Sequence, residues 1–309
     1  MSFEEMDVSE IWMDGEFVDW ADATVHVLTH ALHYGSGVFE GARCYDTERG
    51  PALFRWDAHV ERLYDSAKPY DLEIDHDPEE LTEATVSLID RQGLGACYIR
   101  PIVFYGYHSL GVNPGDNPTR TAIACWPWGT YLGEGALENG VDVKVSSWRK
   151  HASSQIPTNA KTTGLYVNSL LAGQEAKRNG FDEAIVLNKE GNVAEGPGEN
   201  LFMVRDEELY TPGLAESILD GITRRTIVTL ARDLGYTVHD EATLSRGELH
   251  TADELFFTGS AAEVTPIRRV DNVTIGDGER GPITEEIQSR FFEVVERRTD
   301  EYDEWFTYV

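Results

Sequence analysis

The sequence predicts a mixed α/β fold built from two domains. In the second half of the chain, apolar strand patterns alternate with amphipathic helical patterns, whereas the first half opens with a hairpin and continues with two helices and two buried strands. A stretch rich in Gly, Pro and aromatic residues separates the two halves. We therefore expect a small N-terminal domain at 1–125, an interdomain loop at 126–137 and a large C-terminal domain at 138–309.

The first half has clear start and stop signals for its elements. A hairpin is predicted at 11–18, where an Asp-Gly turn joins two short apolar runs. Helices are predicted over 57–68 and 77–93, because each opens with an Asp that can act as N-cap and then repeats apolar residues at helical spacing. Two apolar runs, 97–105 and 121–126, predict buried strands.

The second half reads as strands connected by helices. Valines alternate at 141–145, and a helix over about 165–179 is closed by a glycine. Ser245 and Glu248 have the spacing of a capping box. The other predicted elements are strands at 183–187, 200–204 and 254–257, and helices from 220 to about 234 and from 284 to about 298.

Charge sets limits on the partners of this protein. The formal net charge is −29, and the acids are spread along the chain. This argues strongly against binding to nucleic acids or anionic membranes, because both need a basic face on the protein. Concentrated salt would screen the self-repulsion, since the Debye length falls to about 3 Å at 1 M. A halophilic source is therefore our hypothesis.

The N-terminus and the cysteines indicate a cytoplasmic location. The first ten residues carry acids and no apolar run, so we expect no export signal, and no apolar stretch approaches the length of a membrane span. Cys44, Cys97 and Cys125 are an odd number of widely spaced cysteines in apolar surroundings. We expect buried free thiols in a reducing compartment rather than disulfides or a zinc site.

Lys161 is the lysine with unusual surroundings. The other five, Lys150 beside Arg149 among them, have ordinary surface contexts, whereas Lys161 lies among small and hydroxyl residues between a strand and a helix. A lysine in a tight turn of low charge loses its proton more easily, and a neutral amine is what Schiff-base chemistry requires. On this segment alone, a surface loop lysine is the more common explanation.

An aldehyde cofactor on that lysine would need further groups. Its phosphate would need helix N-termini, hydroxyls and an arginine, and its ring nitrogen would need a carboxylate. Gly221 to Thr223 open a helix, Gly259 to Ala262 form a turn of small residues, Arg62 lies in a helix with an apolar face, and Glu195 is fixed among glycines and a proline. Each has a plain structural explanation when taken singly.

Other patterns carry less weight. His26, His30 and His33 have a spacing that can suit metals, but they lack a helical pattern and partner ligands, so we expect no metal site. Gly35 and Gly37 do not continue into a dinucleotide-binding fingerprint. No phosphate-binding loop, serine-hydrolase elbow or metalloprotease motif occurs in the sequence.

Taken together, several motifs in order along nearly the whole chain have a family resemblance. They are HALHYGSGVFEGARCY at 30–45, HVERL at 59–63, YIRP at 98–101, LGVNP at 110–114, IPTNAK at 156–161, AEGPGENLF at 194–202, LDGITR at 219–224 and GSAAEVTP at 259–266. This set resembles the branched-chain amino-acid aminotransferases, which are class IV aminotransferases of fold type IV that depend on pyridoxal 5′-phosphate.

The resemblance implies a role for each cofactor residue. Lys161 would form the Schiff base with the cofactor and then move the proton between the substrate Cα and the cofactor C4′, a step worth about 10² to 10⁴ in rate. Glu195 would pair with the ring nitrogen and Tyr166 with the ring hydroxyl. The phosphate would be held by Arg62, Ile222, Thr223 and Ser260, and the resemblance adds Gly198, Leu219, Gly221 and Gly259 to the cofactor site.

The resemblance also implies a substrate pocket. Its residues would be Tyr34, Phe39, Arg43, Tyr98, Arg100, Trp128, Tyr131, Ser260, Ala261 and Ala262, with Val112 reaching in from a neighbouring subunit of a homodimer or a larger oligomer such as a hexamer. An aromatic wall would reward a branched side chain by about 0.8 kcal/mol per buried methylene. The guanidinium of Arg100 would pair with the γ-carboxylate of glutamate when that substrate is bound.

Three alternatives remain at this point. Within the same fold, a D-amino-acid aminotransferase or an aminodeoxychorismate lyase would keep Lys161, Glu195 and Arg62, but would have no obvious use for Arg43 and Arg100. A non-catalytic protein that binds a phosphorylated ligand would carry no cofactor on Lys161. The polar loop at 105–110 and the two threonines after Lys161 depart modestly from the family pattern and leave the side-chain preference open.

Overall fold

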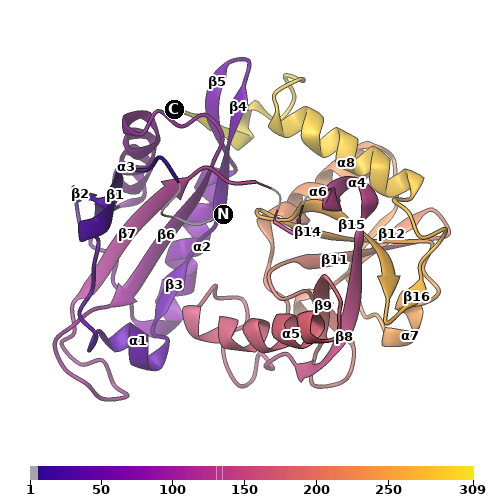
Figure 1. Ribbon diagram of the computed structural model, residues 1–309, viewed down its shortest axis with the longest axis horizontal. Helices are drawn as coiled ribbons and strands as arrows, with labels where there is room; N and C mark the ends of the chain where they lie inside the picture. Colours follow the sequence, from indigo (N-terminus) through magenta and orange to yellow (C-terminus); the bar gives the residue numbers. More distant parts are fainter. Residues whose placement is uncertain (1–5, 130, 134) are drawn as a thin grey trace. The chain divides into compact units, whose positions relative to one another are not determined.

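The computed structural model describes residues 6–129, 131–133 and 135–309 (Figure 1). Residues 1–5, and residues 130 and 134 of the expected interdomain loop, lie outside the described part. The chain forms two compact units, each made of separate segments. Unit 1 comprises Met1–Gly129, Ala160–Leu165 and Val294–Val309, and unit 2 comprises Thr130–Asn159 and Tyr166–Glu293. The contiguous domains inferred from the sequence stay a prediction.

Unit 1 contains an eight-stranded sheet among its described residues. The strand order is β17-β5-β4-β6-β7-β1-β2, and β3 pairs with β6 as well. All of these pairs are antiparallel. The strands are β1 (Glu10–Met13), β2 (Glu16–Asp19), β3 (Gly37–Phe39), β4 (Ala42–Thr47), β5 (Gly50–Phe54), β6 (Cys97–Tyr105), β7 (Thr119–Trp126) and β17 (Phe306–Tyr308).

The core of unit 1 lies where two helices pack against this sheet. The helices of the unit are α1 (His30–Tyr34), α2 (Trp56–Ala67) and α3 (Pro78–Arg91). Leu63 of α2 and Leu88 of α3 are almost completely buried in the same apolar cluster as Ile99 and Ile123 of the sheet. Because the apolar face of each helix packs in the core, only the side chains on its other faces are available to contact the site.

Unit 2 contains a nine-stranded mixed sheet among its described residues. The order is β10-β9-β8-β15-β14-β11-β12-β13, with β16 beside β15, and β8 runs parallel to both of its neighbours. The strands are β8 (Val141–Arg149), β9 (Glu183–Leu187), β10 (Val193–Glu195), β11 (Asn200–Arg205), β12 (Glu208–Pro212), β13 (Val238–Ala242), β14 (Glu254–Gly259), β15 (Glu263–Val270) and β16 (Val273–Thr274).

Helices cover this sheet and connect its parallel strands. Helix α5 packs on β8 and β9, α4 on β15, and α6 on β14 (Figure 1). A right-handed crossover by a helix is the usual way to join parallel neighbours such as β8 and β9. The helices are α4 (Ala136–Asn139), α5 (Tyr166–Arg178), α6 (Ile222–Asp233), α7 (Arg246–Leu249) and α8 (Pro282–Val295).

The structure confirms the predicted fold class and most of the predicted elements. It corrects one helix start, and it places His30 and His33 on helix α1, where no helical pattern was expected. Asp77 caps α3 in a capping box, as expected, but α2 begins at Trp56 and its N-cap is Arg55 in a left-handed conformation (φ 54°) rather than Asp57. The three cysteines are free and buried, as predicted. No helix in the described part of the chain is long and apolar enough to cross a membrane.

Candidate active site

Lys161 is held firmly within unit 1. Its backbone N–H donates to the hydroxyl of Ser66 at 2.9 Å, and its carbonyl accepts from the N–H of Phe39 at 3.0 Å. The residue that follows it forms a β-bridge with β3. The side chain is half-buried, and its amine lies 5.1 Å from the centre of the Phe39 ring. The backbone at Lys161 is therefore fixed by α2 on one side and by β3 on the other.

Arg62 lies on α2 and binds a buried acid. Its Nε and Nη2 donate to the two carboxylate oxygens of Glu40 at 2.7 and 2.9 Å, which makes the contact bidentate. Glu40 is fully buried and also accepts from Nδ1 of His59 at 2.7 Å. Burial raises the pKa of the Glu40 carboxyl, but Arg62 and His59 outweigh it and hold that pKa well below its usual range. Burial likewise lowers the pKa of His59, although the carboxylate opposes this.

An aromatic cluster in unit 1 surrounds Arg100. The guanidinium carbon lies 4.9 Å from the centre of the Phe39 ring and 5.3 Å from that of Tyr98, as in cation–π contacts. Tyr98 stacks on Trp128 with ring centres 5.0 Å apart, and Trp126 packs edge-on against Trp128. Nη2 of Arg100 donates to the Tyr98 hydroxyl at 3.3 Å, while its buried Nε has no acceptor among the described residues. The cluster combines a large apolar surface with a guanidinium that can bind a further acceptor.

The other predicted substrate residues of unit 1 are more exposed. Tyr34 ends α1 and is 44% exposed, and Val112 is 85% exposed. Arg43 donates from Nη2 to the carbonyl of Gly129 at 3.5 Å. Gly41 has a packing reason, because a Cβ at this position would collide with the hydroxyl of Tyr98. The position of Tyr98, a predicted site residue, thus explains why a glycine is present at position 41.

Unit 2 contains a second buried carboxylate, Glu195, at the end of β10. Its Oε2 accepts from Nδ2 of Asn200 at 2.9 Å and from the backbone N–H of Leu219 at 3.0 Å. Its Oε1 is ion-paired with the ammonium of Lys150, and the two side chains are 7% and 19% exposed. Two N–H donors and an ammonium all favour the ionised form of a carboxylate. This geometry keeps a negative charge in place inside unit 2.

The ion pair of Lys150 corrects the sequence analysis. Lys150 was interpreted as an ordinary surface lysine because it adjoins Arg149, yet its ammonium contacts Glu195. It directly follows β8, so its side chain is aimed by the sheet and not by its sequence neighbours. Glu40 and His59 were also missed as site residues. A signal for His59 was present, because a histidine three residues before Arg62 lies on the same helix face.

Two backbone segments of unit 2 can hold an anion. Gly221 is the N-cap of α6, and Ile222 and Thr223 form the buried first turn, whose N–H groups lack partners within the helix. A side chain at Gly221 would collide with Oδ1 of Asn200. The same asparagine binds Glu195, so it links the start of α6 to the buried carboxylate.

The second segment follows β14. Gly259 ends this strand, and Ser260, Ala261 and Ala262 form the turn before β15. Ala262 is buried at 2% exposure, whereas Ser260 and Ala261 are half-buried. Small side chains in such a turn let a ligand come close to the backbone. The turn therefore supplies N–H donors and one hydroxyl near the surface of unit 2.

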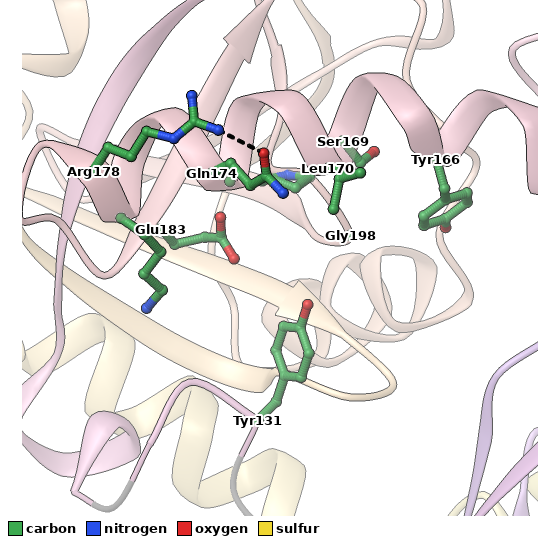
Figure 2. A pocket seen from close by; sticks show the side chains of 11 residues that line it. Tyr131, Tyr166, Ser169, Leu170, Gln174, Arg178, Glu183 and Gly198 are labelled. Atoms are coloured by element: carbon green, nitrogen blue, oxygen red, sulfur yellow. Dashed lines mark hydrogen bonds between the residues drawn. The ribbon is translucent and has the colours of Figure 1, made fainter.

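Tyr131, Tyr166 and Gly198 line one cavity of about 670 Å³ in unit 2 (Figure 2). Figure 2 shows Tyr166 at one end of α5 and Tyr131 rising from the loop below, while Glu183 and Gln174 line the other end. The hydroxyl of Tyr131 is close to Gly198, since a Cβ there would lie 3.9 Å from it. Three residues predicted from separate motifs are thus brought to one cavity.

Comparisons with known proteins agree on one family. The family model for amino-transferase class IV matches residues 37–270. The branched-chain-amino-acid aminotransferase of Pseudomonas aeruginosa is 49% identical over 299 residues, which is 97% of each chain. The crystal structure of the Escherichia coli branched-chain amino acid aminotransferase has a TM-score of 0.95 and 48% identity over 97% of this chain and 98% of that one.

A further solved structure is named for the cofactor that it carries. It is the branched-chain amino acid aminotransferase from Thermobaculum terrenum in its PLP-form, the holo-form. Its TM-score is 0.91 and its identity 33%, over 97% of this chain and 98% of that one. That relative binds pyridoxal phosphate on the same fold.

Proposed function

The chain belongs to the amino-transferase class IV family as a branched-chain-amino-acid aminotransferase, and from this premise we propose which of its residues performs each part of the reaction. The family, fold type, activity and cofactor predicted from the sequence are confirmed. The enzyme is a transaminase that depends on pyridoxal phosphate. The reaction is the reversible transfer of an amino group between L-leucine, L-isoleucine or L-valine and 2-oxoglutarate.

The donors present in each unit fit this cofactor. It requires an amine for its aldehyde, N–H groups and a cation for its phosphate, and a carboxylate for its ring nitrogen. Unit 1 offers Lys161 and Arg62, and unit 2 offers Glu195 and the N–H groups at the start of α6. When bound, pyridoxal phosphate supplies an electron sink that stabilises negative charge at the substrate Cα.

Lys161 is the proposed catalytic residue. Its Nζ would hold the cofactor aldehyde, and the same amine would accept the proton of the substrate Cα and return it. The amine lies above the Phe39 ring, and its backbone is fixed by Ser66 and Phe39. A base held in this way needs little reorganisation to reach the Cα proton.

Unit 2 is proposed to hold the ring and part of the phosphate. Glu195 keeps the ring nitrogen protonated, because it stays ionised among Asn200, Leu219 and Lys150. Tyr166 would bind the ring hydroxyl, and the backbones of Gly198 and Leu219 would contribute to the ring site. The phosphate is assigned to Arg62 and to donors of unit 2 at Gly221, Ile222, Thr223, Gly259 and Ser260.

The observation that carries the substrate assignment is the position of Arg100 among aromatic rings. Phe39, Tyr98 and Trp128 offer the apolar surface that a branched side chain needs. The guanidinium can pair with the γ-carboxylate of glutamate, whose charge would otherwise be unpaired on that surface. The remaining proposed substrate contacts are Tyr34, Arg43, Val112, Tyr131, Ser260, Ala261 and Ala262.

Turnover with two amino donors tests this assignment. Purified protein should transfer amino groups from L-leucine to 2-oxoglutarate and should not use D-alanine. Turnover of D-alanine alone would instead support a D-amino-acid aminotransferase. The absorption spectrum provides a second measurement, because added L-leucine should shift the band of the bound cofactor in the wild type but not in Lys161→Ala.

We further propose that the enzyme is a homodimer or a larger homo-oligomer. Unit 1 exposes several large apolar side chains, and exposed apolar patches often mark the contact surfaces of protein assemblies. The most exposed are Val27 at 70%, Leu32 at 62%, Tyr107 at 53% and Val112 at 85%. Val112 would then reach the substrate site of a neighbouring copy. Light scattering should give at least twice the chain mass, and a monomer would contradict the proposal.

A reducing and salt-rich cytoplasm is the proposed environment. The three cysteines are free and buried, and the formal net charge of −29 leaves the chain strongly self-repelling in dilute buffer. Salt screens such repulsion. The thermal midpoint of unfolding should therefore rise when KCl is increased from about 0.1 M to about 2 M. An unchanged midpoint would count against a halophilic source.

A further inference from the structure

Glu40 is the most enclosed charged group of unit 1. Its side chain has no exposed surface, and each carboxylate oxygen is occupied by donors. Oε1 accepts from Nε of Arg62, while Oε2 accepts from Nη2 of Arg62, from Nδ1 of His59 and, at 3.3 Å, from the N–H of Gly41. A carboxylate so surrounded has no capacity left for a substrate or a cofactor. Its function must be exerted on its neighbours.

We propose that Glu40 and His59 are positioning residues that orient Arg62 towards the cofactor phosphate. This inference rests on the proposed role of Arg62. An arginine has five N–H donors in one rigid plane, and the bidentate contact with Glu40 uses Nε and Nη2. Fixing these two nitrogens fixes the plane and therefore the direction in which Nη1 donates.

The placement of these residues on α2 supports this role. His59, Arg62 and Ser66 are three and four residues apart, so they share one face of the helix. The first two contact Glu40, and Ser66 accepts from the N–H of Lys161 at 2.9 Å. The residue before Glu40, Phe39, donates to the carbonyl of Lys161. One helix face and one strand end thus set both the amine and the guanidinium.

A purely structural role would not require charge at Glu40. Removing an ion from water is costly, and an apolar group of similar size often stabilises a buried site equally well. In this chain the acid lies where it directs a planar cation through two hydrogen bonds. His59 completes the arrangement, because its Nδ1 donates to the same oxygen that accepts from Nη2 of Arg62.

The two cofactor forms with and without phosphate provide the test. Full-length protein stripped of cofactor is titrated with pyridoxal 5′-phosphate and with pyridoxal, and both dissociation constants are measured by absorbance. In Glu40→Gln the affinity for pyridoxal phosphate should fall about tenfold to a hundredfold, as for a lost hydrogen bond to a charged group. The affinity for pyridoxal should stay within about twofold, because pyridoxal has no phosphate for Arg62 to bind.

Matched variants separate the two levels of inference. Glu61→Gln removes an exposed acid from the same helix and should leave both affinities unchanged. If Arg62→Ala weakens both ligands equally, the proposed phosphate role of Arg62 fails. If Arg62→Ala is selective for the phosphate form but Glu40→Gln is not, the positioning role of Glu40 is wrong.

His59 variants keep the inference testable even if Glu40→Gln does not fold. Asparagine can place an N–H donor close to the position of Nδ1, whereas alanine cannot. His59→Ala should lose affinity for pyridoxal phosphate several-fold relative to pyridoxal, and His59→Asn should recover most of it. Equal losses for both ligands, or no recovery in His59→Asn, would overturn the proposal.

Discussion

The two units use charge in opposite ways. Unit 1 presents cations, Lys161 and Arg62, and supports the arginine with the buried acid Glu40. Unit 2 presents an acid, Glu195, and supports it with the cation Lys150. In unit 1 the supporting group is the more buried member of the pair, since Glu40 is 0% exposed and Arg62 is 12% exposed. In unit 2 it is the less buried member, since Lys150 is 19% exposed and Glu195 is 7% exposed.

If Arg62 and Glu195 hold the cofactor as proposed, burial alone does not identify the functional member of an ion pair. Both oxygens of Glu40 are occupied by donors, so none remains for a ligand. In Glu195, Oε2 accepts from the side chain of Asn200 and the backbone of Leu219, while Oε1 is paired with the long side chain of Lys150. The remaining hydrogen-bonding capacity distinguishes the two acids. We therefore expect the variants below to separate a group that performs chemistry from a group that orients it.

The largest effect should follow removal of the cation that unit 1 presents to the reaction. Lys161→Ala should lower turnover of L-leucine by about 10⁴-fold, the upper end of the range for positioned proton transfer. The control is Lys189→Ala, which removes an exposed lysine and should retain wild-type turnover. Steady-state rates with 2-oxoglutarate measure both. Comparable losses in the two variants would contradict a specific role for Lys161.

The acid that unit 2 presents should come next. Glu195→Gln should reduce kcat by about 10² to 10³, as expected when one preorganised electrostatic group is lost. Glu216→Gln is the matched control, because Glu216 is also a buried acid of unit 2 and binds Asn188 and Thr243 instead. Equal losses of kcat in both variants would indicate a general effect of burial and not a contact with the cofactor.

Loss of the support in unit 2 should have a smaller effect. Lys150→Ala leaves Glu195 with its two N–H donors, so we expect kcat to fall by about ten- to a hundredfold, in keeping with a lost interaction between charged groups. Lys150→Arg preserves the charge and should restore most of the rate.

Substrate selectivity should respond to Arg100. Single-turnover spectra of Arg100→Ala should show the glutamate half-reaction slowed about tenfold more than the leucine half-reaction, because only glutamate brings a γ-carboxylate to the aromatic cluster. Phe39→Leu changes the apolar surface instead of the charge. It should slow the leucine half-reaction at least as much as the glutamate half-reaction. Equal losses in Arg100→Ala would assign the arginine to packing alone.

Sequence patterns predicted the elements of this fold well where the signal is local. The Asp77 cap and the strand from Cys97 to Tyr105 are found as expected, because capping and continuous apolar runs depend on neighbouring residues. The start of α2 was predicted too late in the chain. Its N-cap, Arg55, has a left-handed backbone conformation that the residue type does not predict. Such starts depend on tertiary packing.

The assignment of the site residues stays a prediction, and it extends only as far as the sequence motifs do. Lys161, Arg62 and Glu195 were candidates from their surroundings in the sequence, and the resemblance of the ordered motifs to one family then assigned their roles. The partners of these residues could not be found in the same way. Lys150 follows β8 and reaches Glu195 of β10 across the strand between them, and Glu40 follows β3 and binds Arg62 of α2. The chain separates the members of each pair by more than twenty residues. Only the folded topology brings them together.

The last prediction concerns stability instead of turnover, and it tests the support in unit 1, which is the contact between His59 and Glu40. Burial lowers the folded-state pKa of His59 below its unfolded value, so the unfolded chain binds one more proton in the window between the two. The free energy of unfolding should therefore decrease as the pH falls below about 6.5, by up to about 1.4 kcal/mol per pH unit for this proton. Glu40 adds nothing there, because its pKa lies well below its usual range and its contribution is lost only in stronger acid. The free energy of unfolding can be measured by urea titration at several pH values between about pH 7.5 and about pH 5.5. The plot of this free energy against pH should be less steep for His59→Asn than for the wild type. Equal steepness would mean that His59 is not held neutral beside Glu40.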